Sequence, residues 1–377
     1  MPSMKLRQEV LRAARRIVVK LGTALVTRDG GALDTGQIAR LVRQMVELRK
    51  RGCEITIVSS GAIGAGMGLV GMKSRPRDVA KLQALAATGQ AALMQMYERA
   101  FRRYGLHAAQ LLLTRSDVDN RIRYLNIRNT LANLHELNAV PIVNENDPVA
   151  VEEIRFGEND VLSALVANLV EADALIILTV VDGLLADGKL VELVDRVDEG
   201  VFSLVDGNRS ELGSGGMMTK LEAMRMVTDA GAIAAIANGR TPDVLPRLLD
   251  GQRLGTVFVP ACRRMSARDR WIRMVARPVG TVRIDAGAVK ALVAGKKSLL
   301  PIGVVEVTGR FERGDVVQVV GPDGRELARG LVNYSAQELG LIKGLRSNKI
   351  AQALGAAPYE EAVHRDNLVL TGERGAV

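Results

Sequence analysis

A lysine stands where a buried strand is expected to end. Residues 17–19 are Ile-Val-Val and Leu21 is apolar too, so residues 16–20 are predicted to form a buried strand that ends at Lys20. Burying an unpaired ammonium is costly. Lys20 therefore either reaches solvent or meets an anion, and an anionic partner would suit phosphate chemistry.

Two glycine-rich stretches lead into predicted helices. The first, SSGAIGAGMG at 59–68, follows a strand, and the second, GSGGMMTK at 213–220, ends in Lys220. Backbone N–H groups at such helix starts bind anions, and the helix dipole adds to the attraction. Two lysines and two such stretches are what phosphoryl transfer needs, because fixed cations and N–H donors stabilise the charge on the transferring oxygens.

Both glycine-rich stretches have simpler interpretations. Residues 66–71 match G-x-G-x-x-G, but these glycines come late after the strand, and residues 87–93 supply no acid where a dinucleotide-binding fold needs one. The second stretch is not a Walker A loop, because Lys220 follows Thr219 directly rather than preceding it. Its alternative interpretation is a surface turn before a helix that carries an ordinary lysine.

Two Glu-Asn-Asp tripeptides, at 145–147 and 158–160, both lie at predicted strand-to-helix edges. Taken alone, Asn159 or Asp160 is most simply a helix N-cap. The occurrence of two such tripeptides favours a further role, in which the Asn and Asp side chains hold a substrate ammonium and its polar groups.

Alternating strands and helices would position these residues. Strands are predicted at 16–20, 53–60, 108–114, 140–143, 174–180 and 233–238, and helices at 37–51, 77–104, 123–137, 159–172 and 217–230. This order, with nearly continuous apolar strands, predicts a mainly parallel sheet covered by helices on both faces. Ligands bind at the carboxyl ends of the strands in such sheets. The polar stretches should therefore collect along one edge.

The pattern changes after residue 259. From there short alternating strands and frequent Gly and Pro turns predict a small, mainly β module with one helix at 285–295. The predicted parts are a basic helical arm at 1–15, an α/β domain at 16–259, a linker at 260–278, a mainly β domain at 279–356 and a tail at 357–377.

Composition narrows the class of protein. A length of 377 residues suits two domains, and 47% hydrophobic with 25% charged residues is normal for a globular protein. Two cysteines, Cys53 and Cys262, make neither a disulfide framework nor a zinc ligand set, so a cytoplasmic location is expected. No apolar run is long enough to span a bilayer. The net charge of +9 fits an anionic substrate, RNA or a solvated arginine-rich surface.

Six segments carry a family resemblance. They are VVKLGT, SSGAI, NENDPVA, GENDVLSALVA, GSGGMMTKL and RDRWI, within a match that runs from residue 16 to about residue 366. Together they resemble the bacterial glutamate 5-kinases of the amino acid kinase family, which carry a C-terminal PUA domain. The resemblance implies a three-layer αβα kinase domain with a mainly parallel sheet, followed by a mainly β PUA domain.

The resemblance also implies a reaction and its partners. It implies phosphorylation of the side-chain carboxylate of L-glutamate by ATP with Mg²⁺, as the first step of proline biosynthesis, with proline as feedback inhibitor. It further implies a homo-oligomer, dimer or tetramer, and glutamate-5-phosphate reductase as the pathway partner.

Roles for residues follow from the same resemblance. Lys20 would contact the ATP phosphates, Lys220 would stabilise the transferring group, and Asp160 would orient both lysines. The glutamate-binding residues would be Ser60, Asp147 and Asn159. The nucleotide-binding residues would be Lys20, Gly22, Gly61, Thr179, Val180, Ser214, Gly215, Gly216, Met217, Met218, Thr219 and Lys220. No side chain is assigned as a metal ligand.

Two departures from the family pattern stand out. Val180 occupies the place of the usual Asp after Thr179, so nucleotide affinity depends on whether that contact uses the backbone or the carboxylate. The segment after Gly183 lacks the usual Ala-Asp-Pro tripeptide.

Three alternatives remain open at this point. A kinase that acts on N-acetylglutamate would share the lysines but should not carry NENDPVA together with a PUA module. RNA binding by the PUA module is not favoured, because residues 279–356 have no dense basic stripe and few aromatics. A kinase whose PUA module serves assembly or regulation is preferred over RNA binding.

Overall fold

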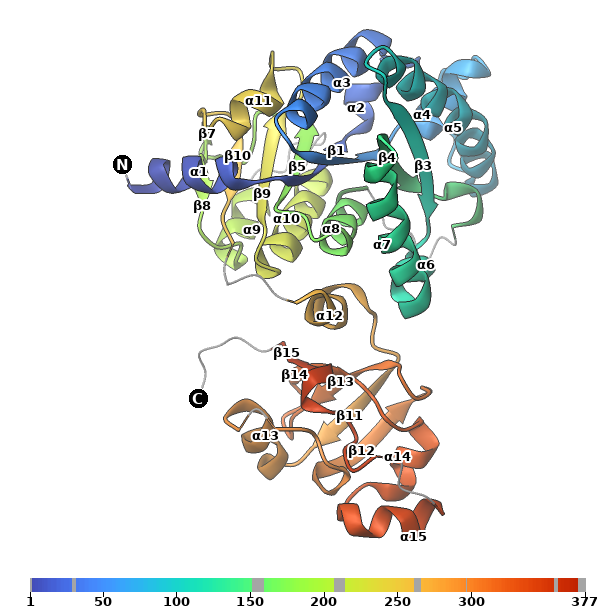
Figure 1. The fold of residues 1–377 in the computed structure, drawn as a ribbon, viewed down its shortest axis with the longest axis vertical. Helices are drawn as coiled ribbons and strands as arrows, with labels where there is room; N and C mark the ends of the chain where they lie inside the picture. Colours follow the sequence, from blue (N-terminus) through green and yellow to red (C-terminus); the bar gives the residue numbers. More distant parts are fainter. Residues whose placement is uncertain are drawn as a thin grey trace. The chain divides into compact units, whose positions relative to one another are not determined.

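The computed structural model describes residues 2–28, 32–150, 159–206, 214–260, 266–295, 297–355 and 359–371. The chain forms two compact units, Met1–Arg264 and Met265–Val377 (Figure 1). In the part of the chain covered by these ranges, no helix combines the length and the apolar character that a membrane crossing requires.

An eight-stranded sheet forms the centre of the first unit, in the order β3-β4-β2-β1-β5-β9-β10-β8. The strands are β1 Arg16–Leu21, β2 Glu54–Ser59, β3 His107–Leu113, β4 Ala139–Glu145, β5 Ala174–Thr179, β8 Leu193–Val194, β9 Ile233–Asn238 and β10 Thr256–Phe258. Neighbouring strands are parallel, apart from the antiparallel pair of β9 and β10. The predicted mainly parallel sheet is confirmed.

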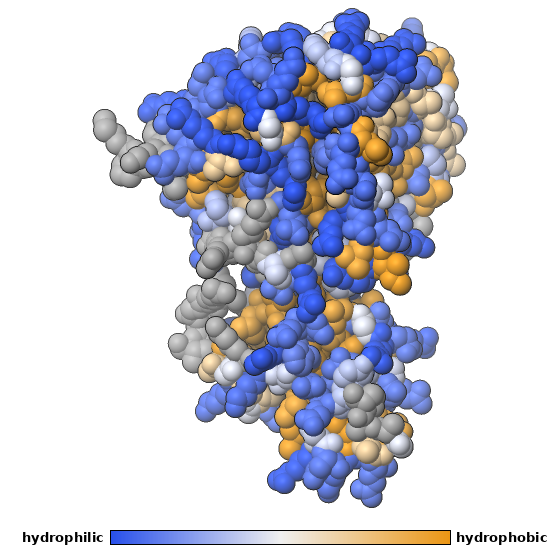
Figure 2. All heavy atoms as spheres, viewed as in Figure 1, coloured by the Kyte–Doolittle hydropathy of each residue, from blue (hydrophilic) through white to orange (hydrophobic). Residues whose placement is uncertain are grey.

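Helices cover both faces of this sheet (Figure 1). The main ones are α1 Pro2–Ala13, α2 Thr23–Val26, α3 Thr35–Lys50, α4 Ala62–Leu69, α5 Val79–Arg102, α6 Arg115–Asp119, α7 Arg121–Glu136, α8 Asn159–Leu169, α9 Glu199–Asp206, α10 Ser214–Asp229 and α11 Val244–Leu249. A small hairpin, β6 Leu185–Ala186 with β7 Lys189–Leu190, follows β5. Over the first unit, the face seen in Figure 2 is mostly hydrophilic, with apolar residues visible between the helices.

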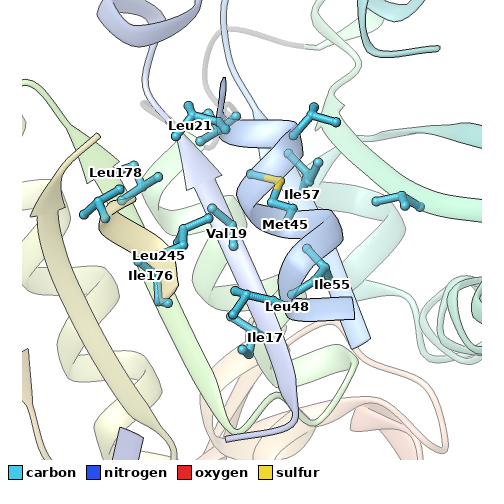
Figure 3. Packing of buried hydrophobic residues seen from close by; sticks show 14 of the residues in the cluster. Ile17, Val19, Leu21, Met45, Leu48, Ile55, Ile57, Ile176, Leu178 and Leu245 are labelled. Carbon is cyan, nitrogen blue, oxygen red and sulfur yellow. The ribbon is translucent and has the colours of Figure 1, made fainter. Parts of the chain in front are cut away.

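The two faces of β1 differ in character. Ile17, Val19 and Leu21 are fully buried in the core beside α3 and α11 (Figure 3). Because side chains alternate across a strand, Lys20 lies on the opposite face, against which α8 packs. The alternation of residues along β1 thus turns the lysine away from the apolar core and toward α8.

The first glycine-rich stretch is mostly the helix α4, into which its glycines were expected to lead. Gly61 has φ 107°, a left-handed conformation that suits glycine, and α4 begins at the next residue. A Cβ on Gly89 of α5 would lie 1.9 Å from the carbonyl oxygen of Ala62, and one on Gly66 would lie 2.0 Å from that of Leu85. These glycines therefore permit close packing of α4 on α5, and only the first turn of α4 has N–H groups that the helix itself does not use.

Arg7 anchors α1 to the first unit. Its side chain is buried and donates hydrogen bonds to carbonyl oxygens of Glu192 at 2.6 Å, Gln252 at 3.0 Å and Gly255 at 3.3 Å, and to that of Leu254. Several backbone acceptors thus surround one guanidinium, which offsets the cost of burying it. Residues 1–15, predicted as a helical arm, therefore include a helix that packs on the α/β unit.

The second unit holds a five-stranded sheet in the order β12-β11-β13-β14-β15. Its strands are β11 Gly280–Ile284, β12 Val304–Gly309, β13 Val316–Val320, β14 Glu326–Leu331 and β15 Leu368–Leu370, and its helices include α12 Ala267–Arg270, α13 Ala286–Val293, α14 Ala336–Ile342 and α15 Ile350–Leu354. The first four strands and α13 match the sequence prediction.

Several elements of the second unit were missed. β15 lies within the residues assigned to a tail and pairs antiparallel with β14. The expectation of one helix was wrong, because α14 and α15 follow β14. α14 carries a capping box between Ser335 and Glu338, an S-x-x-E signal that the sequence offered. The π-helical turn Trp271–Val275, inside the predicted linker, packs on β14 and β15.

Candidate active site

Three charged side chains from three elements meet at the carboxyl edge of the parallel strands. Nζ of Lys20 in β1 lies 2.6 Å from Oδ1 of Asp160, and Nζ of Lys220 in α10 lies 3.0 Å from Oδ2. Exposed fractions are 4% for Lys20, 0% for Asp160 and 8% for Lys220. We call these three residues the charged cluster. The structure therefore brings together the three residues that the sequence nominated as catalytic.

The electrostatics of the charged cluster favour an ionised Asp160. Burial by itself raises the pKa of this carboxyl, but the ammonium groups of Lys20 and Lys220 outweigh that effect, so the pKa lies below its ordinary value. With Asp160 ionised, the three groups carry one net positive charge in a buried place. Lys20 thus meets its anion in Asp160, and an anionic ligand would compensate the charge that remains.

α10 adds two further contacts to the charged cluster. Oγ1 of Thr219 donates to Oδ2 of Asp160 at 3.0 Å, and Nζ of Lys220 donates to the carbonyl oxygen of Gly216 at 2.8 Å. Thr219, nominated only as part of the nucleotide segment, thus also helps to hold Asp160. The lysine side chain folds back over the first turn of its own helix, which keeps its ammonium near the start of α10.

Asn159 links a second group of polar side chains. Its Nδ2 donates to the carbonyl oxygen of Ser59 at 2.9 Å, to Oγ of Ser60 at 3.0 Å and to Oδ1 of Asn144 at 2.8 Å. The simple N-cap interpretation of Asn159 therefore does not account for its side-chain amide. Its bond to Ser60 joins two of the three predicted glutamate-binding residues.

Asn144 extends this group to α5. Its Nδ2 donates to Oε1 of Gln90 at 2.9 Å, and its Oδ1 also accepts from the backbone N–H of Glu145 at 2.9 Å. We call Gln90, Asn144 and Asn159 the amide cluster. Asn144 directly precedes the first Glu-Asn-Asp tripeptide but was not nominated as a site residue. Gln90 was missed, since it sits alone among Ala and Gly residues of a helix.

Asp147 begins a short 3₁₀ turn, Asp147–Val149, after β4. It lines a cavity of about 210 Å³ together with residues of α5 and β3. Its placement next to the amide cluster is compatible with the predicted role in binding glutamate. Glu158, in the second tripeptide, lies outside the described residues.

The predicted nucleotide-binding residues surround the same sheet edge. Thr179 ends β5 and its carbonyl oxygen accepts from the N–H of Gly239 at 2.8 Å, while Val180 after it is 41% exposed. Gly22 follows β1, and a Cβ placed on it would lie 4.0 Å from Nζ of Lys20. Residues 214–220 form the first turns of α10, but the side chain of Ser214, like residues 207–213, lies outside the described part.

Protein ligands for a metal ion are scarce at this edge. Within the described ranges, no group of three or more His, Cys, Asp or Glu side chains is arranged to hold a metal. Both carboxylate oxygens of Asp160 face lysines. Mg²⁺ commonly keeps several waters and binds substrate phosphates with few protein ligands. The described residues therefore fit Mg²⁺ only as part of the nucleotide, not in a protein cage of its own.

Comparisons with known proteins decide the family. Residues 15–238 match the model of the amino acid kinase family, and residues 280–354 match that of the PUA domain. A glutamate 5-kinase of Caldanaerobacter subterraneus is 47% identical over 367 residues, which are 96% of this chain and 98% of that protein. This chain belongs to the glutamate 5-kinases of the amino acid kinase family. The family predicted from the six segments is confirmed.

Other glutamate 5-kinases match over similar lengths. That of Nitrosospira multiformis is 48% identical over 370 residues, and that of Burkholderia multivorans is 49% identical over 370 residues. Both matches cover 96% of this chain and 100% of the relative. Among solved structures, a carbamate kinase from Giardia lamblia bound to AMP-PNP matches with a TM-score of 0.48 and 18% identity, over 66% of this chain and 99% of that one.

Proposed function

We propose that this glutamate 5-kinase family member transfers the γ-phosphoryl group of ATP to the side-chain carboxylate of L-glutamate. The observation that carries the proposal is the charged cluster, a buried Lys-Asp-Lys arrangement with one net positive charge. The names of the relatives supply the substrate. A site with this charge and position suits a reaction in which two anions must approach each other.

The chemistry requires no general base. The nucleophile is a carboxylate, which is already ionised at neutral pH. One of its oxygens forms a bond to the γ-phosphorus while the bond from that phosphorus to the β,γ-bridging oxygen breaks, and ADP leaves with the electron pair. Lys20 and Lys220 screen the repulsion between the two anions and stabilise the transferring oxygens. Asp160 holds both ammonium groups in place.

The remaining nominated residues bind the two substrates. Ser60, Asp147 and Asn159 hold glutamate. The nucleotide is held by Thr179 and Val180, by residues 214–220, and by backbone N–H groups at Gly22 and Gly61. Mg²⁺ enters with the ATP phosphates, where it neutralises part of their charge. The residues of this chain bind and align the reactants for an in-line transfer.

The wider role follows from the product. We propose that glutamate 5-phosphate made here enters proline biosynthesis through glutamate-5-phosphate reductase, that proline inhibits the enzyme, and that the chain works in the cytoplasm as a homo-oligomer, a dimer or tetramer. The PUA domain is proposed to serve assembly or regulation rather than RNA binding. The domain boundaries proposed for these roles are 16–259 for the kinase domain and 279–356 for the PUA domain.

The decisive experiment traps the acyl phosphate with hydroxylamine. Purified protein with ATP and Mg²⁺ is given L-glutamate, N-acetylglutamate or L-aspartate, and hydroxamate is measured. Hydroxamate that depends on L-glutamate and falls when proline is added is the expected result. Equal or greater product with N-acetylglutamate would replace the proposed substrate, and no product from a folded protein would overturn the proposed reaction.

A further inference from the structure

One buried amide donor next to the proposed glutamate site is unused. Gln90 in α5 is 9% exposed, and its Oε1 accepts the hydrogen bond from Asn144. Within the described part of the chain, its Nε2 has no hydrogen-bond partner. A buried N–H group without an acceptor destabilises the fold relative to a paired one. A ligand acceptor would remove that destabilisation.

The hydrogen bonds around Gln90 determine which of its two terminal side-chain atoms is oxygen and which is the NH₂ group. The N–H of Glu145 can only donate, so the side-chain atom of Asn144 that meets it must be oxygen. The other terminal atom of Asn144 is therefore the NH₂ group, which donates to Gln90. It follows that Gln90 presents oxygen to Asn144 and its own NH₂ group elsewhere.

Gln90 also lines a cavity of about 210 Å³ beside Asp147. Its polar lining includes Gln90, Gln110, Glu145 and Asp147, and alanines of α5 line part of the rest. A residue with an unused donor and two acidic residues in one lining match a ligand that carries both an acceptor and a cation. A free α-amino acid has both, in its α-carboxylate and its α-ammonium.

Helix packing holds Gln90 in this place. The preceding residue, Gly89, lies so close to α4 that a Cβ on it would meet the carbonyl oxygen of Ala62 at 1.9 Å and the backbone nitrogen of Gly66 at 2.3 Å. α5 is thus seated against the helix that starts beside Ser60. A donor that packing holds rigidly can discriminate between ligands, because the site cannot rearrange to accommodate a ligand that fits poorly.

We propose that Gln90 is a specificity-determining residue whose Nε2 donates to the α-carboxylate of the substrate, while Asp147 and Glu145 face the α-ammonium. The proposal rests on the proposed function, since the ligand is the glutamate of that reaction. The side chain of Gln90 is hydrogen-bonded to Asn144, which in turn is hydrogen-bonded to Asn159, the residue that precedes Asp160. Gln90 thereby links binding of the α-carboxylate of glutamate to the position of its side-chain carboxylate, which accepts the phosphoryl group.

Ligands that differ only at the α-carboxylate test this assignment. 4-Aminobutyrate is glutamate without that group, and L-isoglutamine carries a carboxamide in its place. Dissociation constants for L-glutamate and both analogues are measured by calorimetry on the full-length wild type, Gln90→Met and Gln90→Glu. Gln95→Met, which changes an exposed glutamine of the same helix outside the cavity lining, serves as the matched control.

Gln90→Met is expected to weaken the binding of glutamate about 10- to 100-fold more than it weakens the binding of 4-aminobutyrate. This is the range for a lost hydrogen bond to a charged group. Gln90→Glu, which keeps an acceptor for Asn144, should disfavour glutamate further and shift preference toward L-isoglutamine, whose carboxamide can donate to the new carboxylate. Gln95→Met should leave the ratios unchanged.

Two results would have different meanings. If both Gln90 variants weaken all three ligands by the same factor while the wild type binds glutamate, Gln90 has only a structural role and the inference is overturned. If the wild type binds no glutamate and yields no hydroxamate, the proposed function itself fails, and the inference fails with it.

Discussion

The charged cluster and the amide cluster are neighbours in the chain and differ in physical nature. Asn159 and Asp160 are consecutive residues at the start of α8, yet one joins a network of neutral amides and the other neutralises two lysines. The charged cluster carries one net positive charge, whereas the amide cluster is neutral and held together by directional hydrogen bonds. The first suits charge stabilisation in a transition state, and the second suits recognition of a shape and its donors.

The largest expected effect comes from removing the carboxylate of the charged cluster. Asp160→Asn leaves two buried ammonium groups without their counter-ion, so it should lower the free energy of unfolding by about 3–5 kcal/mol at pH 7. Urea denaturation measures this. The matched control is Asp250→Asn, which breaks an exposed pair with Arg51 at 3.1 Å and should cost less than about 1 kcal/mol.

The difference in unfolding free energy between wild type and Asp160→Asn should depend on pH. The pKa of Asp160 is lower in the folded state than its ordinary value, so the carboxylate stabilises the fold above the unfolded pKa of about 4. That contribution disappears only as pH falls through the folded pKa. The gap between wild type and Asp160→Asn should therefore stay constant from pH 8 to pH 5 and close in stronger acid. A gap that closes near neutrality would contradict the assignment.

The next effect separates catalysis from stability. Lys220→Met removes a cation proposed to act on the transferring group, and turnover in the hydroxamate assay should fall about 100- to 1000-fold, by analogy with loss of one oxyanion donor. Lys20→Met should behave alike. Lys50→Met, at an exposed position of α3, is the control and should keep wild-type turnover. Normal turnover in both cluster variants would remove the charged cluster from the mechanism.

A smaller effect, without pH dependence, is expected in the amide cluster. Asn144→Ala leaves the N–H of Glu145 and the amides of Asn159 and Gln90 short of a partner, so it should destabilise the fold by about 1–3 kcal/mol. Because none of these groups titrates, the loss should be the same at pH 8 and pH 4. Asn133→Ala, on the exposed side of α7, should stay within about 0.5 kcal/mol of wild type. A loss that varies with pH would mean that the two clusters are not distinct.

The smallest effect concerns the departure after β5. Val180→Asp restores the residue usual in the family at an exposed position, so stability should change by less than about 0.5 kcal/mol. If the nucleotide is held there by backbone atoms, its dissociation constant should change less than about threefold, which is near 0.6 kcal/mol. Calorimetry with ATP measures it. A change of tenfold or more would show that a carboxylate works there, and would extend the charged part of the site to Val180.

Local pattern was enough to predict most of the α/β unit. Strand β1 and helix α3 follow from apolar periodicity, and the turn after α3 from Gly52, which has φ 86°. The second unit was harder, because β15 and α15 are short, and β15 is stabilised by pairing with β14, which lies far from it in the sequence. α14 had a readable start, the capping box at Ser335, but few residues to show a helical period.

The candidate site divides in the same way. Lys20, Asp160 and Lys220 were nominated because their motifs resemble those of a family, and the ends of parallel strands predicted a shared edge. Gln90 carries no such signal, since a single glutamine in an alanine-rich helix is ordinary. Only the position of α5 against α4, which Gly66 and Gly89 permit, brings it to the edge.

By itself, the sequence of this protein determined the side of β1 on which its lysine lies, because side chains alternate along a strand and the odd positions are apolar. It also determined that the strand ends would be polar. Only the tertiary structure decided which groups meet there. The lysine of α10, the aspartate of α8 and the glutamine of α5 converge through crossovers and helix packing, and those depend on contacts between residues far apart in the chain, which no local pattern records.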